Sequence, residues 1–318
     1  MSNDSKIVIP KLAVDFGNRT ALAYDGKKVY KITSSRYLLT GHDIAGRKSS
    51  KKEVYIRTKQ PDGDVSFVIG ADEKDSEFTY RTDKFKVAQT LLMGLLWQLP
   101  SVCRIDELVI VDSLPNDANR RNQYRVNIPT EFGWQTTDKK GNIIERKLTI
   151  TNKISFVKEG LGAIIQAGLL NSSALAVNLG CGTLDFVTFN RGEVVEKLST
   201  NFDKEGAVSF QRELQREIGG FTKQPYQIFQ ALENGGDLVV MDEGLEEKTV
   251  NIKSQAENVC YEWLKKNVGV AIKELGGLPQ GVPVIITGGL ANLVTEKYKD
   301  HPVISVVKNP EQANVRVF

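Results

Sequence analysis

The sequence predicts an α/β protein built from two similar domains, and three observations lead to this fold class. The chain has 318 residues, which at about 150 residues per domain corresponds to two domains, each long enough to bury an apolar core. A pattern of strand, glycine-containing turn and strand recurs half a chain apart. Segments with the periodicity of strands also alternate with segments that have the periodicity of helices.

The repeat lies at residues 13–24 (AVDFGNRTALAY) and 176–187 (AVNLGCGTLDFV), an offset of 176 minus 13, or 163 positions. Each copy predicts a hairpin, because two apolar strands flank a turn and the second strand ends at another glycine turn. The offset aligns Ala13 with Ala176, Val14 with Val177, Asp15 with Asn178, Gly17 with Gly180 and Thr20 with Thr183. Two similar turns, one in each domain, can hold one ligand between them.

The other elements are expected in order along the chain. Residues 29–70 alternate apolar and polar side chains between glycine and proline breaks, which predicts short strands and loops. We expect a helix at 83–98, strands at 106–115 and 153–157, and helices at 159–170, 210–219 and 254–276. After these, residues 284–294 predict a buried strand that breaks at a glycine pair and resumes as a helix, and Asn309-Pro310 predicts the start of a last short helix.

Composition and charge exclude several classes of protein. The 42 basic and 39 acidic side chains leave a net charge of +3, too small to indicate direct nucleic-acid binding. The cysteines and histidines are too scattered for a disulfide framework or a zinc site. Pro10 and charged residues stand where a signal peptide needs its apolar core, and the longest apolar stretch, 87–99, is too short to span a membrane. A cytoplasmic protein without a membrane partner is therefore expected.

Two turns have the composition of phosphate-binding loops. Backbone N–H groups can converge on one anion where no side chain intervenes, and glycine supplies this geometry. The segments 17–20 (GNRT) and 180–183 (GCGT) each offer a turn of small residues with a hydroxyl at its end. Asp15, at the end of an apolar strand, has the carboxylate needed to hold a metal-bound water beside a phosphate. Neither a GxxxxGK[ST] loop nor a GxGxxG motif after the first strand is present.

The three segments VDFGNRT, NLGCGTLDF and VIITGGLANLV resemble the phosphate 1, phosphate 2 and adenosine motifs of the actin/Hsp70/sugar-kinase superfamily. Their order and spacing fit this superfamily across nearly the whole chain. Within it, the short length and the segments DSLPND, FVKEGLGA, NFDKEGA and ITGGLANLV look most like the bacterial ParM/StbA plasmid-segregation family. The resemblance implies an actin-like fold of two RNase H-like αβ domains that flank a nucleotide cleft.

The resemblance also implies an activity, with ATP and Mg²⁺ as cofactors. It is that of an ATPase that polymerises head to tail into filaments and segregates plasmid DNA through a DNA-binding adaptor protein. The chain's main partner would then be other copies of itself.

The resemblance assigns roles to individual residues. Asp15 would hold Mg²⁺ through water, and Glu159 would orient the attacking water, although a charge on the first turn of a helix also has a purely structural interpretation. Together with Asn178, these two residues form the implied catalytic set. The implied nucleotide-binding residues are Gly17, Asn18, Arg19, Thr20, Gly180, Cys181, Gly182, Thr183, Gly206, Gly288, Gly289, Leu290 and Asn292.

The expected domain limits follow the same resemblance. Domain I would comprise 1–165, with a small insertion at about 30–100, and the C-terminal residues 303–318 would return to it. Domain II would comprise 166–302, with an insertion at about 203–278.

One position departs from the family pattern. The second phosphate motif usually begins with Asp, whereas this chain has Asn178. Asparagine can still hydrogen-bond a metal-bound water, but it carries no charge and cannot accept a proton as a carboxylate does. We therefore expect ATP to bind and hydrolysis to be slow.

Two other functions remain open at this point. A small-molecule kinase of the same superfamily would use a carboxylate such as Asp112 or Asp185 as a base toward a substrate hydroxyl. A nucleotide-dependent scaffold that does not polymerise would share the nucleotide site but not the self-assembly.

Overall fold

The computed structural model describes residues 6–39, 43–60, 63–70, 77–78, 84–180, 183–203, 206–219, 226–241, 246–274, 276–277 and 281–318. The chain divides into two compact units. Unit 1 contains Met1–Gly162 together with Asn314–Phe318, and unit 2 contains Ala163–Ala313. The chain therefore passes from one unit to the other twice, within the short helix α3 (Leu161–Gln166) and near the end of the 3₁₀ segment η4 (Pro310–Val315).

Unit 1 is built on one sheet, whose described strands follow the order β3-β2-β1-β8-β10-β9-β5-β6-β4-β7. These strands are β1 (Lys6–Phe16), β2 (Thr20–Tyr24), β3 (Val29–Thr33), β4 (Ser35–Leu38), β5 (Val54–Gln60), β6 (Gly63–Ile69), β7 (Glu77–Phe78), β8 (Val102–Asp112), β9 (Glu131–Thr137) and β10 (Ile143–Lys158). β8 pairs parallel with both β1 and β10, while the hairpins are antiparallel. β1, β8 and β10 thus form a parallel centre of the sheet, and the other strands extend the sheet on both sides of it.

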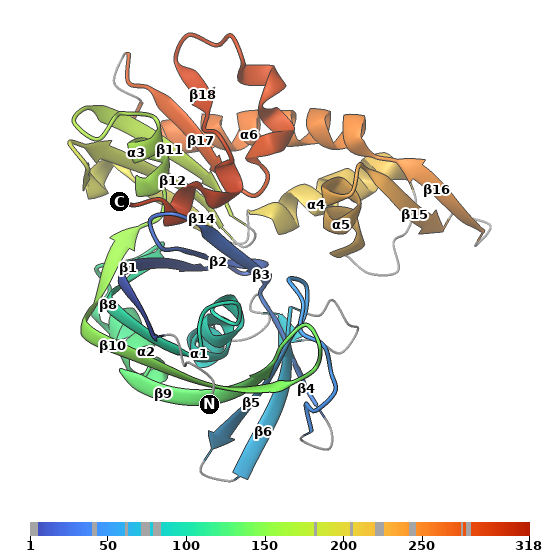
Figure 1. Cartoon of the computed structure of the whole chain (residues 1–318). Helices are drawn as coiled ribbons and strands as arrows, with labels where there is room; N and C mark the ends of the chain where they lie inside the picture. The colour runs from blue at the N-terminus through green and yellow to red at the C-terminus, as the bar shows by residue number, and fades with distance from the viewer. Residues whose placement is uncertain are drawn as a thin grey trace. The chain divides into compact units, whose positions relative to one another are not determined.

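The core of unit 1 lies between this sheet and helix α1 (Lys84–Leu95), which Figure 1 shows inside the curve of the sheet. Apolar side chains occur all round α1, from Phe85 to Leu95, and nearly all of them are buried. A helix that is apolar on every side needs a core to enclose it, so the predicted buried helix is confirmed. The second helix, α2 (Ala118–Asn127), begins at Asp117, whose side chain accepts a hydrogen bond from the backbone N–H of Arg120.

Unit 2 is built on a smaller sheet of order β13-β12-β11-β17-β18, with β14 paired to β12. Its strands are β11 (Ser173–Leu179), β12 (Thr183–Asn190), β13 (Glu193–Val194), β14 (Thr200–Asp203), β17 (Val284–Gly288) and β18 (Ile304–Val306), and a separate hairpin consists of β15 (Asp237–Met241) and β16 (Glu247–Asn251). The helices are α4 (Ala207–Ile218), α5 (Tyr226–Glu233) and α6 (Lys253–Glu274), with short 3₁₀ turns at η1 (Glu196–Leu198), η2 (Ala291–Val294) and η3 (Glu296–Tyr298). Figure 1 shows α4 and α6 beside one another in this unit.

The core of unit 2 joins the central strands β11, β12 and β17 to α4 and α6. Trp263 of α6 is almost fully buried against Phe210 of α4, with ring centroids 6.4 Å apart, and its indole N–H donates to the Ser209 hydroxyl over 3.2 Å. The buried indole keeps a hydrogen-bond partner, which is the usual condition for tryptophan in a core.

The sequence repeat corresponds to a structural repeat. β1 pairs antiparallel with β2, and β11 pairs antiparallel with β12. In the first hairpin Asp15 lies opposite Leu22, and in the second Asn178 lies opposite Asp185, so the offset of 163 holds in the register of both ladders. In both units a parallel strand flanks the first strand of the hairpin, namely β8 in unit 1 and β17 in unit 2.

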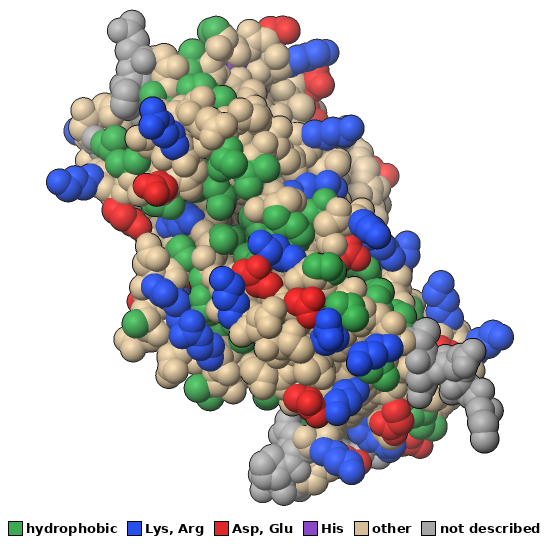
Figure 2. Space-filling view, turned by 60° about the vertical axis from the view of Figure 1, so that its left-hand side comes forward, with side chains coloured by type: hydrophobic (Ala, Val, Ile, Leu, Met, Phe, Trp, Pro, Cys, Tyr) green, Lys and Arg blue, Asp and Glu red, His purple; other side chains and the backbone are tan. Residues whose placement is uncertain are grey.

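Some details differ from the sequence prediction. The chain returns to unit 1 at Asn314, later than the expected residue 303, because Ile304–Val306 pair with β17 and so remain in unit 2. After the glycine pair at 288–289 the chain continues as the 3₁₀ turn η2. No helix among the described residues is long and apolar enough to cross a membrane. On the face in Figure 2, basic and acidic side chains lie interspersed, in keeping with the small net charge.

Candidate functional site

The first predicted phosphate turn connects β1 and β2 in unit 1. β1 ends at Phe16 and β2 begins at Thr20, so Gly17, Asn18 and Arg19 form the whole connection. A Cβ atom on Gly17 would lie 2.6 Å from the carbonyl oxygen of Thr20, closer than real Cβ contacts come. Only glycine therefore fits here, and the start of the turn presents backbone without a side chain, as phosphate binding requires.

Asp15 and the backbone next to Glu159 are linked by a residue that the motifs did not indicate. Asn314, 7% exposed, donates from Nδ2 to Oδ2 of Asp15 over 3.4 Å. Its Oδ1 accepts a hydrogen bond of 3.1 Å from the backbone N–H of Gly160, next to Glu159. One side chain at the C-terminal crossing point thus holds both the metal-binding candidate and the loop that carries the water-orienting candidate. Nothing in the local pattern around Asn314 signals this, because its partners lie far away in the sequence.

Asp112 ends β8 in the middle of a cluster of positive charges. It is 1% exposed, and it forms ion pairs of 3.3 Å with Lys84 and 2.8 Å with Arg120. The Tyr124 hydroxyl and the Leu114 backbone N–H also donate to its carboxylate. Burial by itself raises the pKa of Asp112, but Lys84 and Arg120 outweigh burial and hold the pKa at about 2. A carboxylate bound in this way is a poor general base.

The second predicted phosphate turn connects β11 and β12 in unit 2. It runs from Gly180 to Thr183, and its two central residues, Cys181 and Gly182, lie outside the described residues. The carbonyl of Gly180 accepts a hydrogen bond of 2.9 Å from the backbone N–H of Ala207, the first residue of α4. The turn is therefore attached directly to the start of a helix.

Gly206 is the N-cap of α4, and no side chain in the described part of the chain caps this helix end. A helix N-terminus combines unpaired backbone N–H groups with the positive end of the helix dipole, so it favours an anion. In this chain the start of α4 lies against Gly180, the first residue of the second turn.

Asn178 and Asp185 lie side by side beneath the second turn. They are opposite one another in the β11–β12 ladder, and they are 2% and 0% exposed. Nδ2 of Asn178 is 3.5 Å from Oδ2 of Asp185, and the Thr183 hydroxyl donates to the same oxygen over 2.8 Å. Unit 2 therefore has a carboxylate beneath the second turn, but Asp185 carries it on β12, whereas the motif usually carries it on the first strand, at the position of Asn178.

The glycine pair that ends β17 has two distinct structural roles. Gly288 has φ +98° and pairs with Leu179, and a Cβ atom on it would lie 2.6 Å to 2.8 Å from the Leu179 backbone. A Cβ atom on Gly289 would meet nothing within 4 Å among the described residues. Gly288 thus lets β17 lie close against the end of β11, whereas the position of Gly289 is open. Farther along, Leu290 is buried, whereas Asn292 is exposed and donates to Glu311 over 3.2 Å.

The predicted residues consequently form two groups, one within each unit. In unit 1, Asn314 links Asp15, which lies just before the first turn, to the backbone of Gly160, the residue after Glu159. In unit 2 the second turn gathers Asn178, Gly206 and Gly288. Asn292 is exposed and hydrogen-bonds Glu311.

The donor set fits magnesium better than a metal held by protein alone. No group of three or more His, Cys, Asp or Glu side chains is clustered for a metal within the described ranges. Within unit 1, Asp15 provides one half-buried carboxylate. Mg²⁺ typically uses one or two carboxylates together with water and substrate phosphates.

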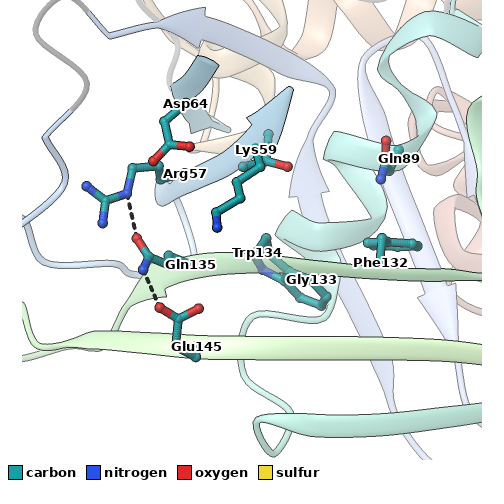
Figure 3. Close-up of a pocket in the computed structure, with 10 residues that line it drawn as sticks. Arg57, Lys59, Asp64, Gln89, Phe132, Gly133, Trp134, Gln135 and Glu145 are labelled. Carbon is teal, nitrogen blue, oxygen red and sulfur yellow. Dashed lines mark hydrogen bonds between the residues drawn. The ribbon is translucent and has the colours of Figure 1, made fainter. Parts of the chain in front are cut away.

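A cavity of about 530 Å³ lies elsewhere in unit 1, between β5, β6, β9 and α1 (Figure 3). Part of its polar wall is hydrogen-bonded internally, because Arg57 donates to Gln135 and Gln135 donates to Glu145. None of the motif residues lines it. It is therefore not the predicted nucleotide site.

No family model matches the sequence, and no curated protein matches it significantly. Solved structures match the fold over nearly the whole chain. An archaeal actin homolog, Ta0583, has a TM-score of 0.73 at 18% identity, covering 96% of this chain and 97% of that one. A 15-stranded ParM filament from Clostridium botulinum has a TM-score of 0.72 at 15% identity, covering 97% of each chain. Bacillus thuringiensis ParM with ATP has a TM-score of 0.60 at 16% identity, covering 96% and 95%. The predicted actin-like fold is confirmed.

Proposed function

We propose that the chain is an actin-like ATPase that binds Mg-ATP, assembles into filaments of its own copies and hydrolyses ATP slowly. The observation that carries this proposal is the duplicated hairpin, in which a turn that begins with glycine follows the first strand in each unit and one carboxylate lies in each strand pair. Two such turns on an actin-like fold provide the backbone donors that a triphosphate needs. The solved ParM structure with ATP, which has the same fold, supports this ligand.

The residues take roles that follow from phosphoryl-transfer chemistry. Such a site works mainly by positioning and by stabilising charge, because the phosphoryl group itself does most of the bond rearrangement. Asp15 holds hydrated Mg²⁺, Glu159 orients the attacking water, and the turns 17–20 and 180–183 bind the β and γ phosphates. The residues proposed to lie near the nucleotide are Gly206, Gly288, Gly289, Leu290 and Asn292. Magnesium, when bound, neutralises the phosphate charge.

The filament is proposed to form by head-to-tail contact, because a heterologous interface that does not close generates an open polymer. The solved ParM filament from Clostridium botulinum supports assembly on this fold. The proposed cellular role is segregation of plasmid DNA in the cytoplasm, through an adaptor protein that binds the DNA. The net charge of +3 gives no reason to propose direct nucleic-acid contact by this chain.

The kinase alternative has less support. Asp112 is held in its ionised form by Lys84 and Arg120, and Asp185 is fully buried and accepts a hydrogen bond from Thr183. A general base must reach the substrate hydroxyl and accept its proton near neutral pH. Neither carboxylate meets both conditions.

The deciding experiment is high-speed sedimentation of the purified chain with Mg-ATP, with Mg-ADP and without nucleotide, with phosphate release measured in the same tubes. We expect pelleting that requires ATP, with little phosphate released. The variant Asp15→Asn serves as the control and should stay in the supernatant. ATP binding without pelleting would favour a scaffold, and an absence of both would contradict the proposal.

The slow hydrolysis has its own test. If the missing charge at Asn178 limits turnover, Asn178→Asp should raise the rate of phosphate release from pelleted filaments. An unchanged rate would remove this part of the proposal.

A further inference from the structure

The two hairpins each contain one carboxylate, on opposite strands. In the first hairpin the carboxylate is on the first strand, where Asp15 lies opposite the apolar Leu22. In the second it is on the second strand, where Asp185 lies opposite Asn178. The two ladders share one register, so Asn178 occupies the position that Asp15 has in the first hairpin. Asn178 has no carboxylate, but the residue directly opposite it, Asp185, does.

The carboxylate of Asp185 determines how the amide of Asn178 is oriented. The amide nitrogen points to Oδ2 of Asp185, 3.5 Å away, and both side chains are buried. The reverse orientation would place the amide oxygen against a carboxylate oxygen, and this repulsion is strong where little water screens it. The covalent geometry of the amide then directs Oδ1 of Asn178 away from Asp185.

The same carboxylate orients the hydroxyl of the phosphate turn. Thr183 donates its proton to Oδ2 of Asp185 over 2.8 Å. A hydroxyl that uses its proton in this way presents oxygen lone pairs to its other neighbours. Asp185 therefore turns both Asn178 and Thr183 into acceptors, and water bound to a metal ion needs acceptors.

We propose that Asp185 is a positioning residue that makes the neutral Asn178 act as an acceptor for the water shell of a nucleotide-bound Mg²⁺. The pair Asn178–Asp185 then replaces the single aspartate that usually begins this motif. This inference depends on the proposed function, because it requires Mg-ATP to bind.

The test exchanges the two side chains. Asp185→Asn removes the carboxylate, Asn178→Asp adds a second one 3.5 Å from the first, and the double variant Asn178→Asp with Asp185→Asn moves the single carboxylate to the other strand. Affinity is measured with a fluorescent ATP analogue, with Mg²⁺ and with EDTA, and the ratio of the two affinities is the magnesium gain. Thermal unfolding is measured in parallel.

We expect Asp185→Asn to lower the magnesium gain about tenfold, the effect of losing one charge-assisted hydrogen bond. The exchanged double variant should recover the gain to within about threefold, as coupled neighbours do in a double-mutant cycle. Asn178→Asp should lower the unfolding temperature without nucleotide, since two buried carboxylates repel one another, and Mg-ATP should reverse most of this loss. The control Asn190→Asp makes the same charge change as Asn178→Asp, but at the far end of β12, and it should leave the magnesium gain unchanged.

Each outcome decides the inference. If Asp185→Asn does not fold, Asn178→Ala removes the amide and leaves Asp185 in place, and it should show the same loss. The positioning role is overturned if either folded variant keeps a normal magnesium gain. It is also overturned if the double variant gains no more from magnesium than Asp185→Asn does. A change in unfolding temperature without a change in magnesium gain overturns it as well. If the unsubstituted chain binds no nucleotide, the proposed function fails and the inference fails with it.

Discussion

The strand next to each hairpin ends differently in the two units. In unit 1 Asp15 lies beside Val111 of β8, and in unit 2 Asn178 lies beside Thr287 of β17, so Asp112 and Gly288 occupy equivalent positions. Asp112 fills its position with a buried carboxylate held by Lys84 and Arg120. Gly288 has no side chain, and Gly289 next to it leaves open space.

The end of β8 and the end of β17 therefore have different roles on the same repeated backbone. A duplicated backbone fixes where the strand ends lie, but the side chains decide whether an end is closed by an ion cluster or left open for a ligand. In unit 1 the ion cluster at the end of β8 stabilises the unit beside Asp15. In unit 2 the open end beside the second turn is where the adenosine is proposed to bind. Four predictions test this contrast.

The largest effect is expected from Asp112→Asn, which removes the charge that closes the end of β8. Lys84 and Arg120 would face one another without their carboxylate, and breaking such a buried ion pair costs roughly 3 kcal/mol. We expect the free energy of unfolding in denaturant to fall by this amount. A loss below 1 kcal/mol would mean that the cluster is an ordinary surface interaction.

The second prediction compares Gly288→Ala with Gly289→Ala. Gly288 has a positive φ, and its Cβ atom would press on the Leu179 backbone, so the substitution should destabilise the chain by about 2 to 3 kcal/mol. The matched change at Gly289 meets no atom within 4 Å and should leave the unfolding temperature nearly unchanged. Equal losses in thermal unfolding would contradict the separate roles of the two glycines.

The third prediction concerns acid. The pKa of Asp112 is lowered from 3.8 to about 2, so the folded state favours the ionised form. This contribution is fully present above about pH 4 and is lost as the pH falls toward 2, a loss of about 2 kcal/mol. The difference in unfolding free energy between the unsubstituted chain and Asp112→Asn should therefore shrink between pH 5 and pH 2. A constant difference would show that the charge of Asp112 is not responsible.

The smallest effect is expected from Asn314→Ala in unit 1. This change removes the hydrogen bonds to Asp15 and to the Gly160 backbone, which should cost about 1 kcal/mol of unfolding free energy. Affinity for Mg-ATP should fall as well, because Asp15 loses a support. The control Asn292→Ala breaks an exposed hydrogen bond to Glu311 and should leave stability within about 0.5 kcal/mol. Matching losses in the two variants would argue against the role given to Asn314.

Local sequence patterns were sufficient for the repeated part of the fold. Hairpins at 13–24 and 176–187, the buried helix α1, and the glycine pair after β17 were all predictable, because periodicity and turn composition are local signals. The actin-like fold followed from three short motifs in order. Strands such as β9 and helices such as α2 were not predicted, since their sequences are mixed and tertiary packing decides their state.

The sequence by itself determined which residues can bind phosphate, namely two glycine turns, Asp15 and the unusual Asn178. Only the tertiary structure decided what supports them. Asp185 lies against Asn178 because β11 and β12 pair in one register, and Asn314 reaches Asp15 across 299 positions of sequence. Asp112 acquires its low pKa from Lys84 and Arg120, which α1 and α2 bring to the end of β8. Such contacts arise when separate elements pack together, and no local pattern of residues encodes them.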